Sequence, residues 1–342
     1  MQPDGKAKSA NRRLGRLWIL CYHSICKEPG SIEDYCFLSA ERFEAQMRGL
    51  ERSRFDVLPL DAALKAQSAE GLERDAVAIT FDDGYRNNLT VAGPILERFG
   101  FQATQFLTTG LIRNNHLLWP NRILFALQNT TVTSLHWRGR EFALTNAKDR
   151  SVANATLQAA AKSLRPDAPD AVAEEIERAL NCPVDPITLP NSDFAMVDAA
   201  DIHAARQKGV FQFGAHTVSH PLLSALSNEA LKVEIEGSVQ SVGELNDGDC
   251  AGFAYPNGRT QDFDARAIAV LRSLNITHAV TTQEQPNTST ADVFRLGRLV
   301  VGSSDTWFKL RLKMWKLSGS AALNSLGFGR GAGHAEPPSR LS

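Results

Sequence analysis

Short apolar stretches and longer amphipathic stretches alternate along the chain, and this alternation predicts strands and helices in turn. Seven apolar runs, rich in β-branched and aromatic residues, have the length of buried strands. Between the first two, Phe43, Met47 and Leu50 recur at helical spacing after Ser39, a residue type that caps helix N-termini. The seven predicted strands span residues 17–23, 76–82, 103–108, 211–215, 251–255, 277–281 and 297–301.

Strands that alternate with helices indicate a parallel sheet, and nearly continuous apolar strands indicate that both of its faces are covered. Residues 262–273, with Ile268 and Leu271, continue the alternation as a predicted helix. The pattern therefore predicts an α/β fold. Seven strand–helix units favour a barrel with one strand fewer than the common eight, and an open doubly wound sheet is the alternative.

One interval interrupts this alternation. Roughly 100 residues separate the third and fourth runs, which is too long for a plain loop. We interpret residues 111–198 as a largely helical insertion beside the site, within a barrel domain of residues 17–318. Helical spacing inside the insertion is shown by Ala171, Val172, Ile176 and Leu180.

Both ends of the chain have the composition of disordered tails. Residues 1–16 are polar and basic, and residues 319–342 are rich in Gly, Ser and Pro. The predicted strand 17–23 is too short for the apolar core of a signal peptide and has no small-residue cleavage site after it. Five cysteines leave an odd one over and form no CxxC pair, which favours reduced thiols and a cytoplasmic location.

The overall charge excludes some classes of partner. A formal net charge of −1 gives no indication of a nucleic-acid partner. No apolar run approaches the roughly 20 residues that a membrane-spanning helix needs. The functional signal therefore has to come from local motifs.

The first motif is Thr80-Phe81-Asp82-Asp83-Gly84-Tyr85, at the end of the second predicted strand. Two adjacent carboxylates before a turn-permitting Gly point in different directions, so one can bind a cation while the other faces a reacting atom. The alternative is an ordinary turn, in which Asp and Gly are common.

The second motif is Gly214-Ala215-His216-Thr217-Val218-Ser219-His220-Pro221, which directly follows the fourth predicted strand. Histidines four residues apart on one helical turn can bind one ion, although such a pair can also be a surface coincidence. Functional residues of parallel barrels lie at the carboxyl ends of strands, where Asp83 is placed as well.

These two motifs together predict a metal site of two histidines and one carboxylate, namely Asp83, His216 and His220. Such a set leaves positions open for water and substrate, as in catalytic zinc sites, so we expect a divalent metal, with Zn²⁺ favoured. Asp82 is placed to accept the proton of an attacking water.

The motifs TFDDGY, HTVSH and FAYPNG, in this order, resemble those of the polysaccharide deacetylases, carbohydrate esterase family 4, also called the NodB-homology domain. The resemblance covers roughly residues 17–305 without the insertion. It implies a distorted (β/α)7 barrel that removes N-acetyl groups from N-acetylglucosamine-type sugars. It further implies Asp82 as the base, the three metal ligands above, and the backbone N–H of Tyr255 as an oxyanion donor.

The chain departs from the better-known family pattern in two places. Ala254 occupies the usual Arg position of the third motif, and the late Leu-x-His is missing. The chain is more similar to the branch that acts on poly-N-acetylglucosamine, in which an N-terminal histidine is the acid. This implies His23 as the acid, with His278 as a reserve candidate. Arg298 is a candidate to replace the missing Arg and orient Asp82, or else a surface ion-pair partner.

Two further segments have competing interpretations. Trp119, in Leu118-Trp119-Pro120, is a candidate platform for a sugar ring or a packing residue of the insertion. Residues 307–317 mix aromatic and aliphatic side chains with four cations, which is typical of a peripheral membrane contact. The same pattern also fits a helix that closes the barrel with its basic residues in solvent.

The leading functional prediction is a zinc-type hydrolase that releases acetate from an N-acetylated sugar, which is free, lipid-linked or polymeric. One alternative keeps the fold and acts on a non-sugar amide. Another is a catalytically inactive carbohydrate-binding protein. The intact set of Asp82, Asp83, His216 and His220 favours an enzyme, because a binding protein has no need of a base beside metal ligands.

Overall fold

The computed structural model describes residues 14–325 except 115, 185–191, 249 and 251. Its centre is a parallel sheet of eight strands in the order β11-β10-β9-β6-β5-β1-β12, with β4 (Asp56–Val57) beside β5. All seven predicted strands are present in this sheet, so that prediction is confirmed. They are β1 (Leu17–Tyr22), β5 (Ala76–Phe81), β6 (Ala103–Leu107), β9 (Phe211–Ala215), β10 (Gly252–Ala254), β11 (His278–Val280) and β12 (Leu299–Val300).

The order of the strands decides between the two predicted architectures. Along β1, β5, β6, β9, β10 and β11, each strand lies beside the next one in chain order, whereas a doubly wound sheet would reverse direction at its centre. The last strand, β12, returns to pair with β1. A bridge between Val280 and Leu296 links β11 to the segment that precedes β12. The sheet is therefore the distorted (β/α)7 barrel that the family resemblance implied.

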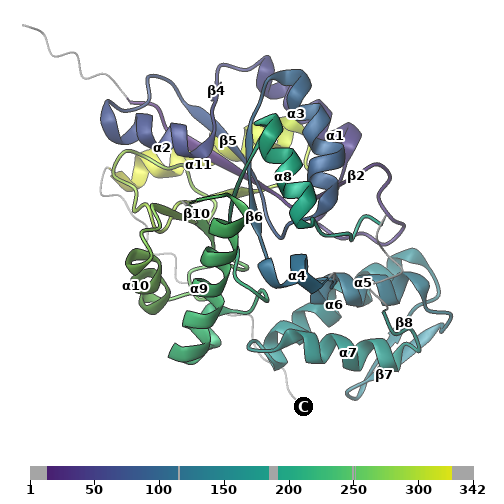
Figure 1. Ribbon diagram of the computed structural model, residues 1–342. Helices are drawn as coiled ribbons and strands as arrows, with labels where there is room; N and C mark the ends of the chain where they lie inside the picture. Colours follow the sequence, from purple (N-terminus) through teal and green to yellow (C-terminus); the bar gives the residue numbers. More distant parts are fainter. Residues whose placement is uncertain (1–13, 115, 185–191, 249, 251, 326–342) are drawn as a thin grey trace, which may run out of the picture.

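Helices cover the outside of the barrel (Figure 1). The predicted helix after Ser39 is α1 (Ala40–Glu51), whose first turn is capped by the Ser39 hydroxyl and whose Phe43, Met47 and Leu50 are buried. The helix predicted at residues 262–273 is α10 (Ala265–Ser273), capped by Asp264. The other helices around the barrel are α2 (Leu60–Ala69), the π-helix η1 (Asn88–Ala92), α3 (Gly93–Phe99), α8 (Ala199–Lys208), the 3₁₀ helix η3 (Leu223–Ala225), α9 (Asn228–Leu245) and α11 (Trp307–Ser325).

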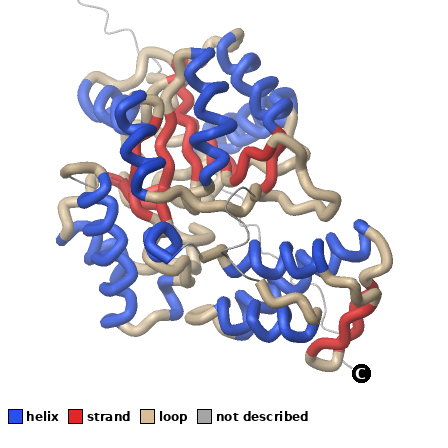
Figure 2. The backbone as a smooth tube through the Cα atoms, turned by 45° about the vertical axis from the view of Figure 1, so that its right-hand side comes forward, coloured by secondary structure: helices blue, strands red, loops and turns tan. Residues whose placement is uncertain are grey.

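The long interval between β6 and α8 forms a lobe of its own below the barrel, at the lower right of Figures 1 and 2. Besides helices it contains an antiparallel hairpin, which the sequence pattern did not predict. The hairpin turns through Arg138 and Gly139, both at positive φ, as a two-residue connection requires. The elements of the lobe are α4 (Thr109–Asn114), α5 (Trp119–Asn129), β7 (Ser134–Trp137), β8 (Arg140–Ala143), α6 (Ala147–Leu164) and α7 (Pro169–Ala179).

The lobe is joined to the barrel through a shared hydrophobic core. Two short parallel strands, β2 (Ser24–Cys26) and β3 (Phe37–Ser39), follow β1 directly. Cys26, Ile32 and Phe37 from this segment pack in the same buried cluster as the interior of α5, α6 and α7. The segment after β1 is therefore held between the barrel and the insertion.

The predicted tails differ from the structure at their inner ends. Residues 14–16 belong to the described structure, and the Arg16 guanidinium pairs with the Asp75 carboxylate at 2.7 Å. At the other end α11 continues to Ser325, so the prediction of disorder from residue 319 is wrong for 319–325. Alanine and leucine, which have high helix propensity, follow Gly319 and Ser320 in the sequence. The rest of both predicted tails, 1–13 and 326–342, lies outside the described residues.

The contact between β6, β9 and β10 leaves no space for a side chain at Gly214. A Cβ atom there would lie 2.6 Å from the Phe106 ring and 2.8 Å from the carbonyl oxygen of Gly252. We expect Gly214→Ala to lower the free energy of unfolding by about 1–3 kcal/mol, as overpacking in cores does. Denaturant unfolding monitored by circular dichroism measures this change.

The matched control is Gly248→Ala, because a Cβ atom at Gly248 meets nothing within 4 Å. Equal unfolding midpoints for the two variants would contradict the close packing of these three strands.

Candidate active site

Ionisable side chains gather at the carboxyl edge of the barrel. His23 follows β1, Asp82 and Asp83 follow β5, and His216 follows β9. Because parallel strands end at the same edge, residues distant in sequence meet there. Arg298 lies one residue before β12 and approaches the same cluster.

Asp83, His216 and His220 form the tightest group. The Asp83 Oδ1 atom lies 3.5 Å from the Nε2 atom of His216 and 3.5 Å from that of His220. This oxygen is buried and has no hydrogen-bond partner among the described residues. A buried carboxylate oxygen facing two ring nitrogens without a bridging hydrogen bond fits a bound cation.

The two histidine rings are oriented for metal ligation. The Nδ1 atom of His216 lies 2.7 Å from the carbonyl oxygen of Ala254, so this nitrogen carries a proton and Nε2 faces Asp83. Burial opposes a second proton on His216, but the charges of Asp82 and Asp83 and the hydrogen bonds to Asp83 and Ala254 outweigh it and raise the pKa of His216. Burial lowers the pKa of His220 to about 4, against the raising effect of the Asp83 charge. His220 is therefore neutral at pH 7, as a metal ligand must be.

Two of these three residues have an unusual backbone conformation. Asp83 has a φ angle of 74° and His220 one of 62°, in the left-handed region that non-glycine residues seldom adopt. Such conformations cluster at functional sites, where the surrounding structure holds them. Here they turn both side chains toward a common point above the strands.

Asp82 is fixed by a different contact. Its two carboxylate oxygens accept hydrogen bonds from the Nη1 and Nη2 atoms of Arg298, both at 2.6 Å. The Arg298 side chain is fully buried, and its Nε atom also donates to the carbonyl oxygen of Thr281 at 2.9 Å. Burial alone would raise the pKa of Asp82, but the charge and hydrogen bonds of Arg298, together with the nearby His216 and His23, outweigh it and hold that pKa well below its usual range.

Arg298 thus makes the contact with Asp82 for which the sequence analysis named it a candidate. A bidentate guanidinium holds a carboxylate in one orientation and keeps it ionised. The alternative that Arg298 is a surface ion-pair partner is wrong, because its side chain has no exposed area.

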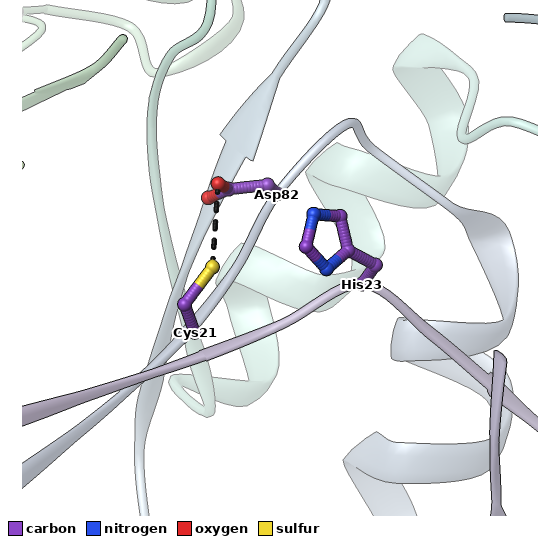
Figure 3. A group of neighbouring side chains, drawn as sticks. All are labelled: Cys21, His23 and Asp82. Atoms are coloured by element: carbon purple, nitrogen blue, oxygen red, sulfur yellow. Dashed lines mark hydrogen bonds between the residues drawn. The ribbon is translucent and has the colours of Figure 1, made fainter. Parts of the chain in front are cut away.

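Figure 3 shows Cys21 and His23 beside Asp82. The Cys21 thiol donates to the Asp82 Oδ2 atom at 3.5 Å, and one potential ligand atom of each of the three residues lies within 4.8 Å of the others. A second cation is nevertheless disfavoured here, because the Arg298 guanidinium already binds both oxygens of Asp82. Burial also raises the pKa of the Cys21 thiol well above its usual value, so it stays protonated.

His23 faces the site with an unpaired ring nitrogen. Its Nδ1 atom is buried and has no hydrogen-bond partner among the described residues. Its ring meets the ring of Tyr35 edge-on, with centroids 5.8 Å apart. Besides His216 and His220, His23 is the only histidine among the described residues that lines the cavity at this site.

The prediction for Tyr255 needs a correction. Its backbone N–H donates to the carbonyl oxygen of Val280 at 3.2 Å and is therefore part of the pairing between β10 and the next strand. Its ring is fully buried and stacks on Phe263 at 3.8 Å between centroids. In this structure the Tyr255 N–H is not directed at the site, because the strand pairing continues one residue beyond the end of β10.

The two remaining candidates lie elsewhere or have another role. His278 is the first residue of β11 and so lies at the amino end of the strand, on the opposite edge of the sheet from the ionisable residues of the site. Trp119 is only 1% exposed and belongs to the core of the insertion, although it also lines the cavity at the site. Its ring packs under the Lys162 ammonium group, 5.8 Å from the ring centre.

The site opens into a cavity of about 320 Å³ between the barrel and the insertion. A larger groove of about 1150 Å³ continues from it along α6. The sequence reasoning missed the residues that line both spaces, because they meet only through the tertiary fold and, apart from Asn257 in the third motif, belong to no motif. They are Asp34, Tyr35, Gln158, Lys162, Asn257 and Arg259.

Comparison with known proteins identifies the family. The sequence profile of the family described as polysaccharide deacetylase matches residues 69–279. The Bacillus subtilis protein YxkH, named as a polysaccharide deacetylase, is 32% identical over 118 residues, which is 34% of this chain and 40% of YxkH. The fold is an α/β barrel with a group of ionisable residues at the carboxyl edge of its strands. The chain belongs to the polysaccharide deacetylase family.

Solved structures show the same fold at low sequence identity. The Streptococcus pyogenes deacetylase PplD, in complex with acetate, is 18% identical, with a TM-score of 0.59 over 88% of this chain and 99% of PplD. IcaB from Ammonifex degensii is 16% identical, with a TM-score of 0.57 over 87% of this chain and 97% of IcaB. Both alignments include most of the chain, so the barrel is shared along nearly its whole length.

If Asp83, His216 and His220 bind one ion, metal must stabilise the fold. We expect Zn²⁺, added to chelator-treated protein at a free concentration of a hundred times Kd, to raise the free energy of unfolding by about 2.7 kcal/mol. The Tm should rise accordingly. His220→Ala should abolish this rise. Differential scanning calorimetry with and without Zn²⁺ measures it.

The control is His203→Ala, because His203 is exposed on α8 and should leave the Zn²⁺ response intact. An undiminished Tm rise in His220→Ala would remove His220 from the ligand set.

Proposed function

We propose that this protein is a metal-dependent deacetylase that hydrolyses the N-acetyl group of a sugar in a glycan or glycolipid precursor. The observation that carries the proposal is the adjacent placement of Asp82 and Asp83. One is an ionised carboxylate held by Arg298, and the other is an unpaired carboxylate facing two histidines. This combination suits hydrolysis of an amide at the base of a cavity.

Asp83, His216 and His220 would hold the metal. Two ring nitrogens and one carboxylate oxygen form a donor set that suits a divalent cation, and Zn²⁺ fits it best. When bound, such an ion supplies Lewis acidity to the acyl oxygen and to water. The protein fixes these ligands through the contact of His216 with Ala254 and the left-handed backbone at Asp83 and His220.

Asp82 would act as the general base. Its carboxylate is ionised and oriented by Arg298, so it can accept the proton of the water that attacks the acyl carbon. The bidentate contact lowers the basicity of Asp82 but removes the entropy cost of orienting it. The adjacent position of Asp83 keeps this base next to the metal ligands.

His23 would act as the general acid. It lines the same cavity as Asp82 and the three metal ligands, and its Nδ1 atom has no partner among the described residues. A histidine ring can carry the proton that the amine nitrogen takes up when the C–N bond breaks. Acetate and the free amino sugar are then the two products.

The shape of the site supports a glycan substrate. The cavity continues into the groove along α6, which has room for several sugar units beyond the N-acetyl group. A non-sugar amide would leave most of this groove without a role, and an inactive binding protein would have no use for an oriented base. A cytoplasmic location, expected from the odd number of cysteines, is part of the proposal.

Acetate release from N-acetylglucosamine oligomers tests the activity. We expect turnover by the Zn²⁺-loaded protein and a fall in kcat of about 10²–10⁴ in Asp82→Asn, because the amide cannot take up a proton at neutral pH. Metal content should stay at the wild-type level in this variant.

Two outcomes would contradict these roles. Loss of metal from Asp82→Asn would make Asp82 a ligand rather than the base. A zinc-loaded wild-type protein that releases no acetate from any N-acetylated sugar would overturn the proposed function.

His23→Ala tests the acid. We expect kcat to fall by about 10²-fold or more while metal content and KM change little, because His23 contacts the leaving amine rather than the metal. His136→Ala, in the hairpin of the insertion, is the control for an exposed histidine. Near-normal turnover by His23→Ala would assign the acid to another residue.

A further inference from the structure

The last described helix, α11, has two apolar faces. Leu310 and Met314 are buried in the barrel core, and Trp307 packs against that core and lies directly over Gly49 of α1. On the opposite side Phe308 is 74% exposed and Trp315 is 71% exposed. The helix therefore carries a second apolar surface that the barrel does not use.

Three residues make up this outer surface, which we call the α11 stripe: Phe308, Leu312 and Trp315. Their spacing of four and three residues places them on one face of a helix. Among the described residues, no other helix carries as many exposed large hydrophobic side chains. Clustered exposed apolar groups of this kind mark interaction surfaces, whereas single ones do not.

Cations border the α11 stripe on both sides. Helical geometry places Lys309 and Lys316 along one edge and Arg311 along the other. Residues 307–325 contain no Asp or Glu. The fourth cation, Lys313, is turned toward the barrel and is neutralised by the Asp305 carboxylate at 2.9 Å.

We propose that the α11 stripe docks on an anionic membrane surface, with Phe308, Leu312 and Trp315 inserted among the lipid headgroups and the flanking cations against lipid phosphates. Aromatic rings and Leu on one face, bordered by Lys and Arg, are the features of helices that lie in the membrane interface. None of the described helices is long and apolar enough to cross a bilayer.

A membrane fits this surface better than a second copy of the chain. A twofold symmetric contact through the stripe would bring Lys309, Arg311 and Lys316 of both copies together, and like charges oppose such a contact. Anionic lipid instead supplies the complementary charge along the whole length of the stripe.

The docked helix would lie next to the substrate groove. Ser303 lines this groove, and the carbonyl oxygen of the adjacent Ser304 accepts a hydrogen bond from Lys309 at 3.0 Å. Membrane contact would thus hold the groove close to the lipid surface. The inference rests on the exposed face of α11 alone and does not depend on the proposed activity.

Sedimentation of the full-length protein with vesicles tests the inference. We expect binding to vesicles of phosphatidylcholine mixed with phosphatidylglycerol, little binding to pure phosphatidylcholine, and weakening by salt. Phe308→Ser with Trp315→Ser should lower the bound fraction by at least about tenfold, and so should Lys309→Glu with Arg311→Glu.

The matched control is Lys232→Glu with Val233→Ser, which changes an exposed cation and an exposed apolar residue on α9. It should bind like the wild type. Trp315 gives a second readout, because it is the most exposed of the five tryptophans. Its fluorescence should shift to shorter wavelength with anionic vesicles, and Trp315→Phe should remove the shift.

Three results would overturn the inference. The first is no sedimentation of the folded wild-type protein with anionic vesicles. The second is equal binding by the wild type and both α11 variants. The third is a wild-type protein that does not bind vesicles but is a dimer in light scattering, with the dimer lost in Trp315→Ser. A second copy of the chain would then occupy the α11 stripe.

Discussion

The buried pair of Arg298 and Asp82 joins the stability of the barrel to the chemistry of its edge. The two residues are 216 positions apart in sequence, and the same guanidinium also holds the Thr281 carbonyl oxygen. The contact thereby connects the end of β5 with the segments around β11 and β12. Loss of one partner from a buried pair leaves an uncompensated charge and costs about 3–5 kcal/mol. One interaction therefore orients the proposed base and holds the closing strands in place.

Beside this rigid pair lie Asp83, His216 and His220, and the protein holds two of these three residues in an unfavourable backbone conformation. The Asp83 Oδ1 atom has no hydrogen-bond partner among the described residues, and Asp83 and His220 both have left-handed backbone. Each such conformation costs on the order of 1–3 kcal/mol. The surrounding strands and the contact of His216 with Ala254 maintain the arrangement. A cation would supply the missing partner and offset part of this cost.

Local sequence patterns predicted most strands of the barrel sheet, two of its helices and the residues of two site motifs. Apolar runs identified seven of the eight strands of the barrel sheet, and helical spacing identified α1 and α10. The group formed by Asp83, His216 and His220, together with the neighbouring Asp82, was predicted from two short motifs at strand ends. The contact of Arg298 with Asp82 was a hypothesis from the resemblance, since no local pattern distinguishes a buried Arg from an exposed one. The hydrogen bond of the Tyr255 N–H depends on strand pairing beyond β10, and the groove residues depend on how the insertion packs. Neither can be read from spacing along the chain.

The core shared by Cys26, Ile32 and Phe37 with the insertion links two parts of the protein that would otherwise evolve separately. The segment that follows His23 packs on the insertion, and the insertion also lines the groove. A lineage that shortened or replaced the insertion to suit another glycan would at the same time loosen the support beneath His23. If His23 is the acid and the groove binds the substrate, substrate range and proton donation are inherited together, and we expect them to diverge together among relatives with different insertions.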